Sequence, residues 1–334
     1  MHYLTMKNLK SDMILAKSII GDNGIVLLNN GKKLSEPILK RMEDMGFQGA
    51  YVSTQVYNDI VVDDIVTDQL RLRAFQALQS NDIESVLAVA NNIVEELKYK
   101  DVLKLDLLDI KSDSNYLYKH SISVALFSAV LGIAGGMNEE QLMNLTVAGL
   151  LHDIGQLEIN EKVRLSKSRF NTEDMEEMKK HPLIAYEKLK DYPRVSSVSK
   201  NAILFHHENL DGSGYYGETS DKLGLFPKIL RIADVYDSMT ALKKYRDAMS
   251  PADTIEYLMS NTGTLFDKSL VILFLKTFPL YPVGFTVLLS NDHIAVVVNN
   301  KSNPMRPVIR LTDGTNIDLS TDSAYRSIVI KGIV

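Results

Sequence analysis

The chain has 334 residues, of which 45% are apolar and 24% are charged, and its formal net charge is −5. This length and composition are typical of globular proteins with two or three domains, and the weak negative charge without a Lys/Arg-rich run excludes a surface that follows a nucleic-acid polymer. The absence of cysteine excludes disulfides and thiolate metal sites, so any metal must be bound by imidazole and carboxylate groups.

Residues 1–20 lack the uninterrupted apolar stretch of a signal peptide. No later segment is expected to reach the roughly 18 apolar residues that are needed to span a bilayer. We therefore expect a cytoplasmic protein without a membrane segment.

Residues 1–58 are predicted to form a small α+β module. The pair Asn23-Gly24 favours a hairpin turn between two apolar segments. A short helix is predicted to begin at Ser35 and to end at Gly46. The predicted strands cover residues 13–20, 25–28 and 49–53.

Residues 59–109 are predicted to form a helical connector. Apolar residues recur at helical spacing on one face, while charged residues occupy the other. This amphipathic pattern suggests that the connector also supplies the contacts of a homodimer. The apolar face includes Val86, Val89, Ile93, Val94 and Leu97.

Residues 110–280 are predicted to form an all-helical domain, and residues 281–334 a small C-terminal β module. The fold class is therefore mainly α, with an α+β module before the helical domain and a β module after it. The helix-start signals are Asn138 with Gln141, Thr172 before an acidic turn, and Ser250-Pro251 with Asp253. The predicted C-terminal strands cover residues 285–289, 293–298 and 307–311.

Histidine is concentrated in the predicted helical domain. Five of the seven histidines lie there beside apolar segments, and this clustering suggests a metal site. They are His120, His152, His181, His206 and His207.

Two dipeptides carry most of this signal. His152-Asp153 follows an apolar segment, so both side chains leave a helix end that is anchored in the core. An adjacent imidazole and carboxylate can bind one ion, and the second oxygen of Asp153 could bridge to another. His206-His207 point in different directions and can serve two ions. A capped helix end and a polar helix terminus are the plain alternatives.

Asp234 lies in an apolar helical segment, with Asp237 three residues later on the same face. Burial of an unpaired carboxylate is costly, so Asp234 needs a cation or a protonating neighbour. His120 alone would fit a core histidine, and His181 alone would fit a surface helix end. Both become candidate ligands because the set needs further donors.

The chain resembles the HD-GYP family of cyclic di-GMP phosphodiesterases over roughly residues 110–280. The N-terminal module and the C-terminal β segment also resemble regions that flank the HD-GYP domain in many members. The motifs that carry the resemblance are HDIGQ at residues 152–156, HP at 181–182, HHENLDGSGYY at 206–216, and ADVYDSMT at 233–240 followed by YRDAMSP.

The resemblance implies a binuclear metal centre. Tyr116 stands where some members carry a glutamate ligand for a third ion, so two divalent ions per chain are expected. Iron or manganese is expected, with zinc as the alternative. One ion would be held by His120, His152, Asp153 and Asp234, and the other by Asp153, His181, His206 and His207.

The resemblance also implies hydrolysis of cyclic di-GMP, or a related cyclic dinucleotide, to linear pGpG and in some members to GMP. A hydroxide that bridges the ions would attack phosphorus, with His152, Asp153 and Gln156 as the catalytic residues. Protein partners in cyclic di-GMP signalling are also expected. The expected substrate contacts are Gly212, Gly214, Tyr215, Asp237, Lys243 and Arg246.

Two positions depart from the family pattern. Gln156 replaces the lysine of HDxGK, and Tyr216 replaces the proline of GYP. Loss of one phosphate contact costs on the order of 1.5 to 3 kcal/mol, roughly 10- to 100-fold in rate.

Three hypotheses therefore stand. The first is an active phosphodiesterase, because every expected metal ligand is present. The second is a catalytically weakened module that retains metal and acts through protein partners, and the third is a generic HD phosphohydrolase of mononucleotides. Restoring lysine at position 156 separates the first two, and a substrate panel separates the third.

Overall fold

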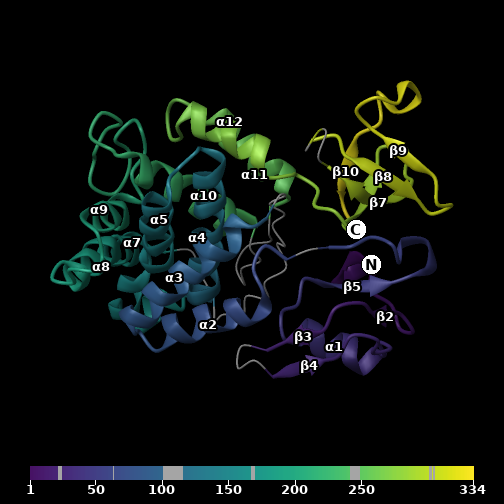
Figure 1. Ribbon diagram of the computed structural model, residues 1–334, viewed down its shortest axis with the longest axis horizontal. Coiled ribbons are helices and arrows are strands. Elements are labelled where there is room, and N and C mark those ends of the chain that lie inside the picture. The colour runs from purple at the N-terminus through teal and green to yellow at the C-terminus, as the bar shows by residue number, and fades with distance from the viewer. Residues whose placement is uncertain are drawn as a thin grey trace.

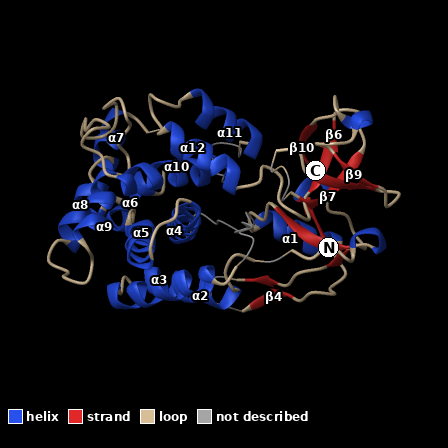
Figure 2. Ribbon diagram, turned by 45° about the horizontal axis from the view of Figure 1, so that its top comes forward, coloured by secondary structure: helices blue, strands red, loops and turns tan. Residues whose placement is uncertain are grey.

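The computed structural model describes residues 1–21, 25–62, 64–100, 116–166, 170–240, 249–300, 303 and 305–334. Helices fill one side of the molecule and most strands lie on the other, where both chain ends also lie (Figures 1 and 2). The expected fold class is confirmed: a mainly helical protein with a small α+β module before the helical domain and a small β module after it.

The N-terminal module is built on an antiparallel sheet in the order β1-β5-β2. Strand β1 was not predicted, and the strand predicted at residues 13–20 is two short strands, β2 and β3, that belong to different sheets. Helix α1 follows Ser35 and ends before Gly46, whose φ of +80° suits glycine. The predicted turn at Asn23-Gly24 lies outside the described residues. The elements are β1 (His2–Thr5), η1 (Met6–Asn8), β2 (Ile14–Leu15), β3 (Ile19–Ile20), β4 (Val26–Leu28), α1 (Glu36–Asp44), β5 (Gly49–Ser53) and η2 (Gln55–Tyr57).

The helical domain packs around α4, which contacts α2, α5, α10 and α12. The elements are α2 (Asp68–Gln79), α3 (Ile83–Lys98), α4 (Tyr116–Ala134), α5 (Glu139–Leu151), η3 (Ile154–Glu158), α6 (Glu161–Arg164), α7 (Thr172–Met178), α8 (His181–Leu189), α9 (Ser197–Phe205), α10 (Leu225–Thr240), α11 (Pro251–Ser260) and α12 (Lys268–Thr277).

The segment predicted as a connector contributes α2 and α3 to the same core. Its apolar face, from Val86 to Leu97, is buried, and α3 packs on α5. Because that face is covered within the chain, it gives no support to the predicted homodimer. The predicted boundary between residues 109 and 110 lies outside the described residues.

The capping signals position the helices that carry the site. Asn138 forms the expected capping box with Gln141 at the start of α5, and Ser250 caps α11. Helix α7 begins at Thr172 as predicted, and Asn171 is its N-cap: Asn171 Oδ1 accepts a hydrogen bond from the Asp174 backbone N–H at 2.8 Å.

Helix α4 corrects one expectation about the sequence. It has 19 residues and a mean hydropathy of 1.4 over its most apolar window, which is enough to cross a membrane by length and composition. However, 78% of that window is buried inside the structure. A helix that is apolar on all sides is also what the centre of a helical core requires.

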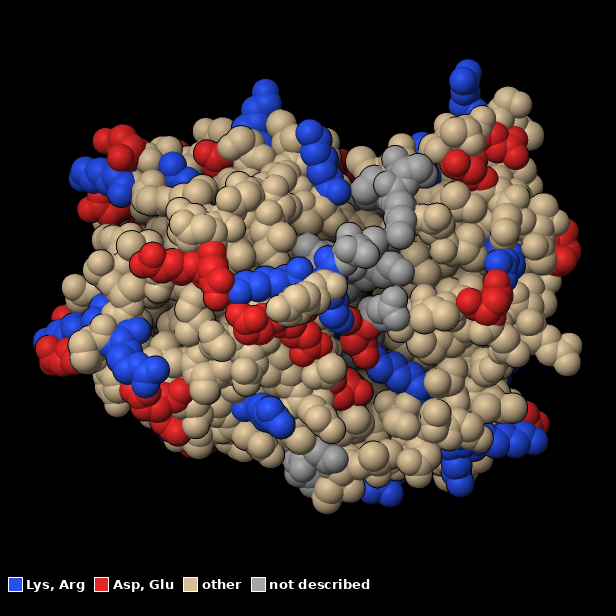
Figure 3. Space-filling model, viewed as in Figure 1, with Lys and Arg blue, Asp and Glu red and all other residues tan. Residues whose placement is uncertain are grey.

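The C-terminal module is a five-stranded antiparallel sheet in the order β10-β6-β7-β8-β9. It contacts the N-terminal module through a bridge between Tyr3 and Phe285 and through Arg310, whose two terminal nitrogens lie 2.5 and 2.9 Å from the Asp59 carboxylate. On the face drawn in Figure 3, acidic and basic side chains are interspersed. The strands are β6 (Thr286–Leu289), β7 (Ile294–Asn299), β8 (Val308–Leu311), β9 (Asn316–Asp318) and β10 (Ile330–Ile333), with η4 (Ser323–Tyr325) before β10.

Candidate metal centre

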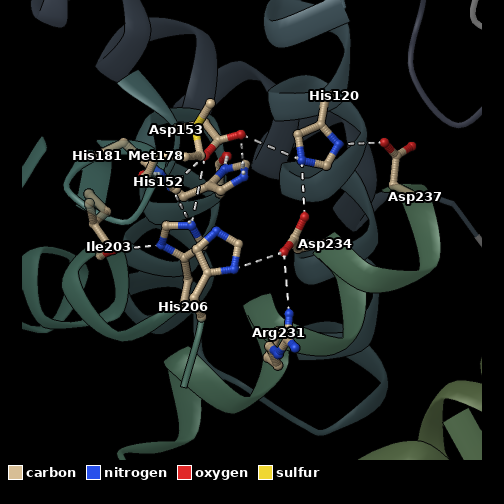
Figure 4. A network of polar contacts seen from close by, with 12 residues as sticks. His120, His152, Asp153, Met178, His181, Ile203, His206, Arg231, Asp234 and Asp237 are labelled. Carbon is tan, nitrogen blue, oxygen red and sulfur yellow. Dashed lines mark hydrogen bonds and ion pairs between the residues drawn. The ribbon is translucent and has the colours of Figure 1, made fainter. Parts of the chain in front are cut away.

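The structure brings all seven predicted metal ligands together inside the helical domain (Figure 4). Most of them sit at helix ends, where the side chain can turn toward the centre of the domain. His152 caps the C-terminus of α5, His181 opens α8, and His206 caps the C-terminus of α9. His120 lies in α4 and Asp234 in α10, two helices that pack against each other.

Three imidazoles are held in one tautomer by the backbone. In each, Nδ1–H donates to the carbonyl oxygen three residues earlier, so the lone pair of Nε2 faces the centre. These bonds join His152 to Gly149 at 2.8 Å, His181 to Met178 at 2.7 Å and His206 to Ile203 at 2.7 Å. The backbone thus presents three nitrogen lone pairs as metal ligands.

Asp153 lies between two sets of imidazoles. Its Oδ1 is 3.1 Å from His181 Nε2 and 3.8 Å from His206 Nε2. Its Oδ2 is 3.4 Å from His152 Nε2 and 3.7 Å from His120 Nε2. A carboxylate placed in this way can bind one ion with each oxygen.

Asp234 also faces both sets. Its Oδ1 is 3.1 Å from His120 Nε2, and its Oδ2 is 3.6 Å from His207 Nδ1. Nearby positive charge holds the Asp234 carboxylate in its ionised form. Burial by itself would raise the pKa of Asp234, but the hydrogen bond from His120 and the electrostatic interaction with His207 outweigh burial and lower this pKa far below its usual range.

The residues fit a metal, because buried polar atoms in the cluster lack partners. His152 Nε2 and Asp153 Oδ1 are buried and form no hydrogen bond within the described part of the chain. Such orphaned atoms are costly in a folded protein unless an ion satisfies them. Two groups of ligand atoms, each within 4.8 Å, include them: Asp153, His181, His206 and His207 form one, and His120, His152 and Asp153 the other.

The protonation states suit cation binding. Burial raises the pKa of Asp153, but the electrostatic interactions with His152 and His181 outweigh burial and hold that pKa well below its usual range. Burial lowers the pKa of His207 to about 3, and burial with the neighbouring imidazoles lowers the pKa of His206 well below its usual value. Neutral imidazoles such as those of His206 and His207, beside ionised carboxylates, are donors that zinc, iron and manganese accept.

His120 is oriented by a second carboxylate. Its Nδ1 lies 2.6 Å from Asp237 Oδ2, so Nε2 faces Asp153 and Asp234. Burial lowers the pKa of His120, but hydrogen bonds to Asp234 and Asp237 outweigh burial and raise it to about 9. Asp237, a predicted substrate contact, is buried in the structure beside His120. Tyr116 stacks on the His120 ring with centroids 5.4 Å apart.

The loop after His207 is held by Glu208, which is buried. The Glu208 carboxylate accepts hydrogen bonds from the backbone N–H of Tyr216 at 2.7 Å and of Glu218 at 2.8 Å. A Cβ on Gly214 would lie 2.5 Å from Glu208 Cα, so this glycine is required by packing inside the loop. The family's proline could not donate the Tyr216 bond, since proline has no N–H.

The remaining predicted substrate contacts are placed as follows. The Tyr215 ring packs on His207, with centroids 4.4 Å apart. Gly212 takes a φ of +77° at the turn. Gln156 is half-buried in η3, three residues after Asp153. Lys243 and Arg246 lie outside the described residues.

Sequence reasoning missed two residues at this site, Arg231 and Asn209. Arg231 Nη1 lies 3.8 Å from Asp234 Oδ2, and Arg231 Nε donates to Asn209 Oδ1 at 3.0 Å. The signal was present in the sequence: Arg231 is three residues before Asp234, a spacing that puts both on one helix face.

Comparisons with known proteins identify the family. The HD domain family model matches residues 76–270. The chain is 32% identical over 222 residues to cyclic di-GMP phosphodiesterase PdeB of Borreliella burgdorferi, covering 65% of this chain and 58% of that protein. It is 32% identical over 158 residues to 3'3'-cGAMP-specific phosphodiesterase 1 of Vibrio cholerae, covering 47% of this chain and 36% of that one. It thus spans less than two thirds of either relative.

Among solved structures, the chain is similar to Bd1817, a HDG"Y"P protein from Bdellovibrio bacteriovorus. The TM-score is 0.49 at 18% identity, and the match covers 81% of this chain and 97% of that one.

Proposed function

The chain belongs to the HD domain family. On that premise we propose that it is a metal-dependent phosphodiesterase that hydrolyses a cyclic dinucleotide, and that its preferred substrate is cyclic di-GMP. One observation carries the proposal: each oxygen of Asp153 faces a different pair of imidazoles. We propose two divalent ions per chain, iron or manganese. Their ligands would be His120, His152, Asp153 and Asp234 for one, and Asp153, His181, His206 and His207 for the other.

When bound, two divalent cations lower the pKa of water and offset negative charge on phosphoryl oxygens. The protein's part is to hold the ligands in one geometry and one protonation state. The backbone carbonyls fix three imidazoles, and Asp237 fixes a fourth, His120. Burial of these side chains excludes bulk water and strengthens their electrostatic interactions.

The proposed substrate is supported by the wall of the site and by the names of the relatives. Tyr215 packs on His207 at the edge of the cluster, where its ring can contact a nucleobase. Both relatives described above act on cyclic dinucleotides by name. We propose linear pGpG as the first product from cyclic di-GMP.

A weakened module that retains metal and acts through protein partners is the second candidate. Its support is Gln156, which places a neutral side chain three residues after Asp153, where the family carries lysine.

A substrate panel tests the proposal. Metal-loaded protein is incubated with cyclic di-GMP, 3'3'-cGAMP, pGpG and mononucleotides, and the products are separated by chromatography. We expect cyclic di-GMP to yield pGpG. Binding of cyclic di-GMP without turnover would favour the second candidate, and turnover of mononucleotides alone would favour a generic HD phosphohydrolase.

A further inference from the structure

The side chains at the metal cluster differ in their exposure. The side chains of His152, His181 and His206 are at most 1% exposed. His207 and Arg231 are each 18% exposed, and both lie beside Asp234. We therefore expect a substrate phosphate to approach the cluster from the side of His207 and Arg231.

Arg231 is held in place beside the cluster. Its Nε donates to Asn209 Oδ1 at 3.0 Å, and Asn209 Nδ2 in turn donates to Ser213 Oγ at 3.0 Å. The guanidinium lies over the Phe266 ring, 5.9 Å from its centroid. Figure 4 shows the side chain directed toward the Asp234 carboxylate.

The terminal nitrogens of Arg231 are available to a ligand. The Nη1 contact with Asp234 Oδ2 is 3.8 Å, which is too long for a hydrogen bond. Among the described residues, Nε alone of the three guanidinium nitrogens makes a hydrogen bond. The two terminal nitrogens therefore retain their N–H groups in the fork that matches phosphate oxygens.

A substrate with two phosphodiester charges calls for a positive side chain beside the metal cluster. A cyclic dinucleotide carries two phosphodiester charges, and Gln156 removes the cation that the family pattern places close to Asp153. The general field of the protein does not replace it, because the net charge is −5. Arg231 is a basic side chain beside the ligand set, with Nη1 at 3.8 Å from Asp234 Oδ2.

We propose that Arg231 is a substrate-binding residue that grips a non-bridging phosphate oxygen of the cyclic dinucleotide and supplies the positive charge missing at position 156. This inference rests on the proposed function, because it takes a phosphodiester as the ligand. In this proposal Arg231 contributes to substrate binding, and the other residues of the cluster bind the metal ions.

The test compares Arg231→Gln, Arg231→Lys and the double variant Arg231→Gln/Gln156→Lys with the wild type, using metal-loaded full-length chain. Arg194→Gln is the matched control, because Arg194 is exposed and pairs with Glu84 away from the ligand set. The readouts are metal content, the Kd for cyclic di-GMP by calorimetry, and the KM and kcat of hydrolysis.

We expect Arg231→Gln to keep its metal and to weaken Kd and KM by about 10- to 100-fold, the usual effect of losing a charge-assisted phosphate contact. Arg231→Lys should recover part of the affinity, and the added lysine at position 156 should recover at least about tenfold. Unchanged Kd and KM in Arg231→Gln would overturn the inference, as would a loss of activity that excess metal restores.

The outcome also separates this inference from the proposed function. If the wild type binds cyclic di-GMP without hydrolysing it, the proposed activity fails and Kd alone decides the role of Arg231. If the wild type hydrolyses cyclic di-GMP and Arg231→Gln does so equally well, only the inference fails. If the wild type binds no cyclic dinucleotide, both fail.

Discussion

Asp237→Asn tests how the first metal site is organised. Asp237 Oδ2 lies 2.6 Å from His120 Nδ1, and both residues are buried. Together with Asp234, this carboxylate raises the pKa of His120 to about 9 despite burial, so it interacts strongly with the imidazole. Loss of a partner of this kind typically weakens metal binding by about 10- to 100-fold, or about 1.4 to 2.7 kcal/mol.

The expected result is asymmetric. The ion beside His120 should bind more weakly, while the ion beside His181, His206 and His207 should be retained, since backbone carbonyls orient His181 and His206. Titration of the metal-free protein with Mn²⁺, with free Mn²⁺ followed by electron paramagnetic resonance, measures the two affinities separately.

Asp292→Asn is the control for Asp237→Asn. Asp292 is an exposed carboxylate in the turn between β6 and β7, where it pairs with Lys331, and its substitution should leave both affinities unchanged. Equal weakening of both ions in Asp237→Asn would refute the reasoning. Unchanged metal binding with a raised KM would return Asp237 to the role of a substrate contact.

Three further predictions concern His120 and the loop that Glu208 holds. In metal-free protein, the free energy of unfolding should fall by about 3 kcal/mol between pH 6.5 and pH 9, because the folded-state pKa of His120 is raised from 6.5 to about 9. The stabilisation by protonated His120 is complete below pH 6.5 and lost above pH 9. Urea unfolding at several pH values measures this fall, and an equal fall in His120→Asn would contradict the prediction. Gly214→Ala should destabilise the protein by about 1 to 3 kcal/mol, because the new Cβ would lie 2.5 Å from Glu208 Cα. If urea unfolding gave the variant the same stability as the wild type, the loop would have moved to accept the Cβ and the prediction would be wrong. Tyr216→Pro restores the family's residue and yet should lower stability by about 1 to 3 kcal/mol, because it removes the N–H that Glu208 accepts; a rise in the melting temperature would refute this.

The helical domain and its ligands could be predicted because local signals agreed with the fold. Asn138 and Ser250 cap helices as their sequences indicate, and the apolar segments before His152 and His206 are helices that end at those residues. Strand β1 and the division of residues 13–20 between two sheets could not be predicted, because sheet partners are set by contacts far apart in the sequence, such as His2 with Val52.

Roles within the site were harder to predict than membership of it. Asp237 shares a helix face with Asp234, but only the packing of α10 on α4 shows that it reaches His120. The apolar face of α3 suggested a dimer because an amphipathic pattern does not say whether its partner is another chain or another helix. Arg231 was overlooked because a basic residue at helical spacing from an acid is usually a surface ion pair.

The central claim is that Asp153 joins two metal ions in a hydrolytic centre. It is tested most directly by elemental analysis and cyclic di-GMP hydrolysis on the same anaerobically purified, manganese- or iron-loaded sample, beside Asp153→Ala. We expect two ions per chain and hydrolysis in the wild type. In Asp153→Ala we expect the two ions and the hydrolysis to be lost, because each Asp153 oxygen faces one set of imidazoles. A wild type without metal, or an Asp153→Ala variant that keeps two ions and full activity, would contradict the account.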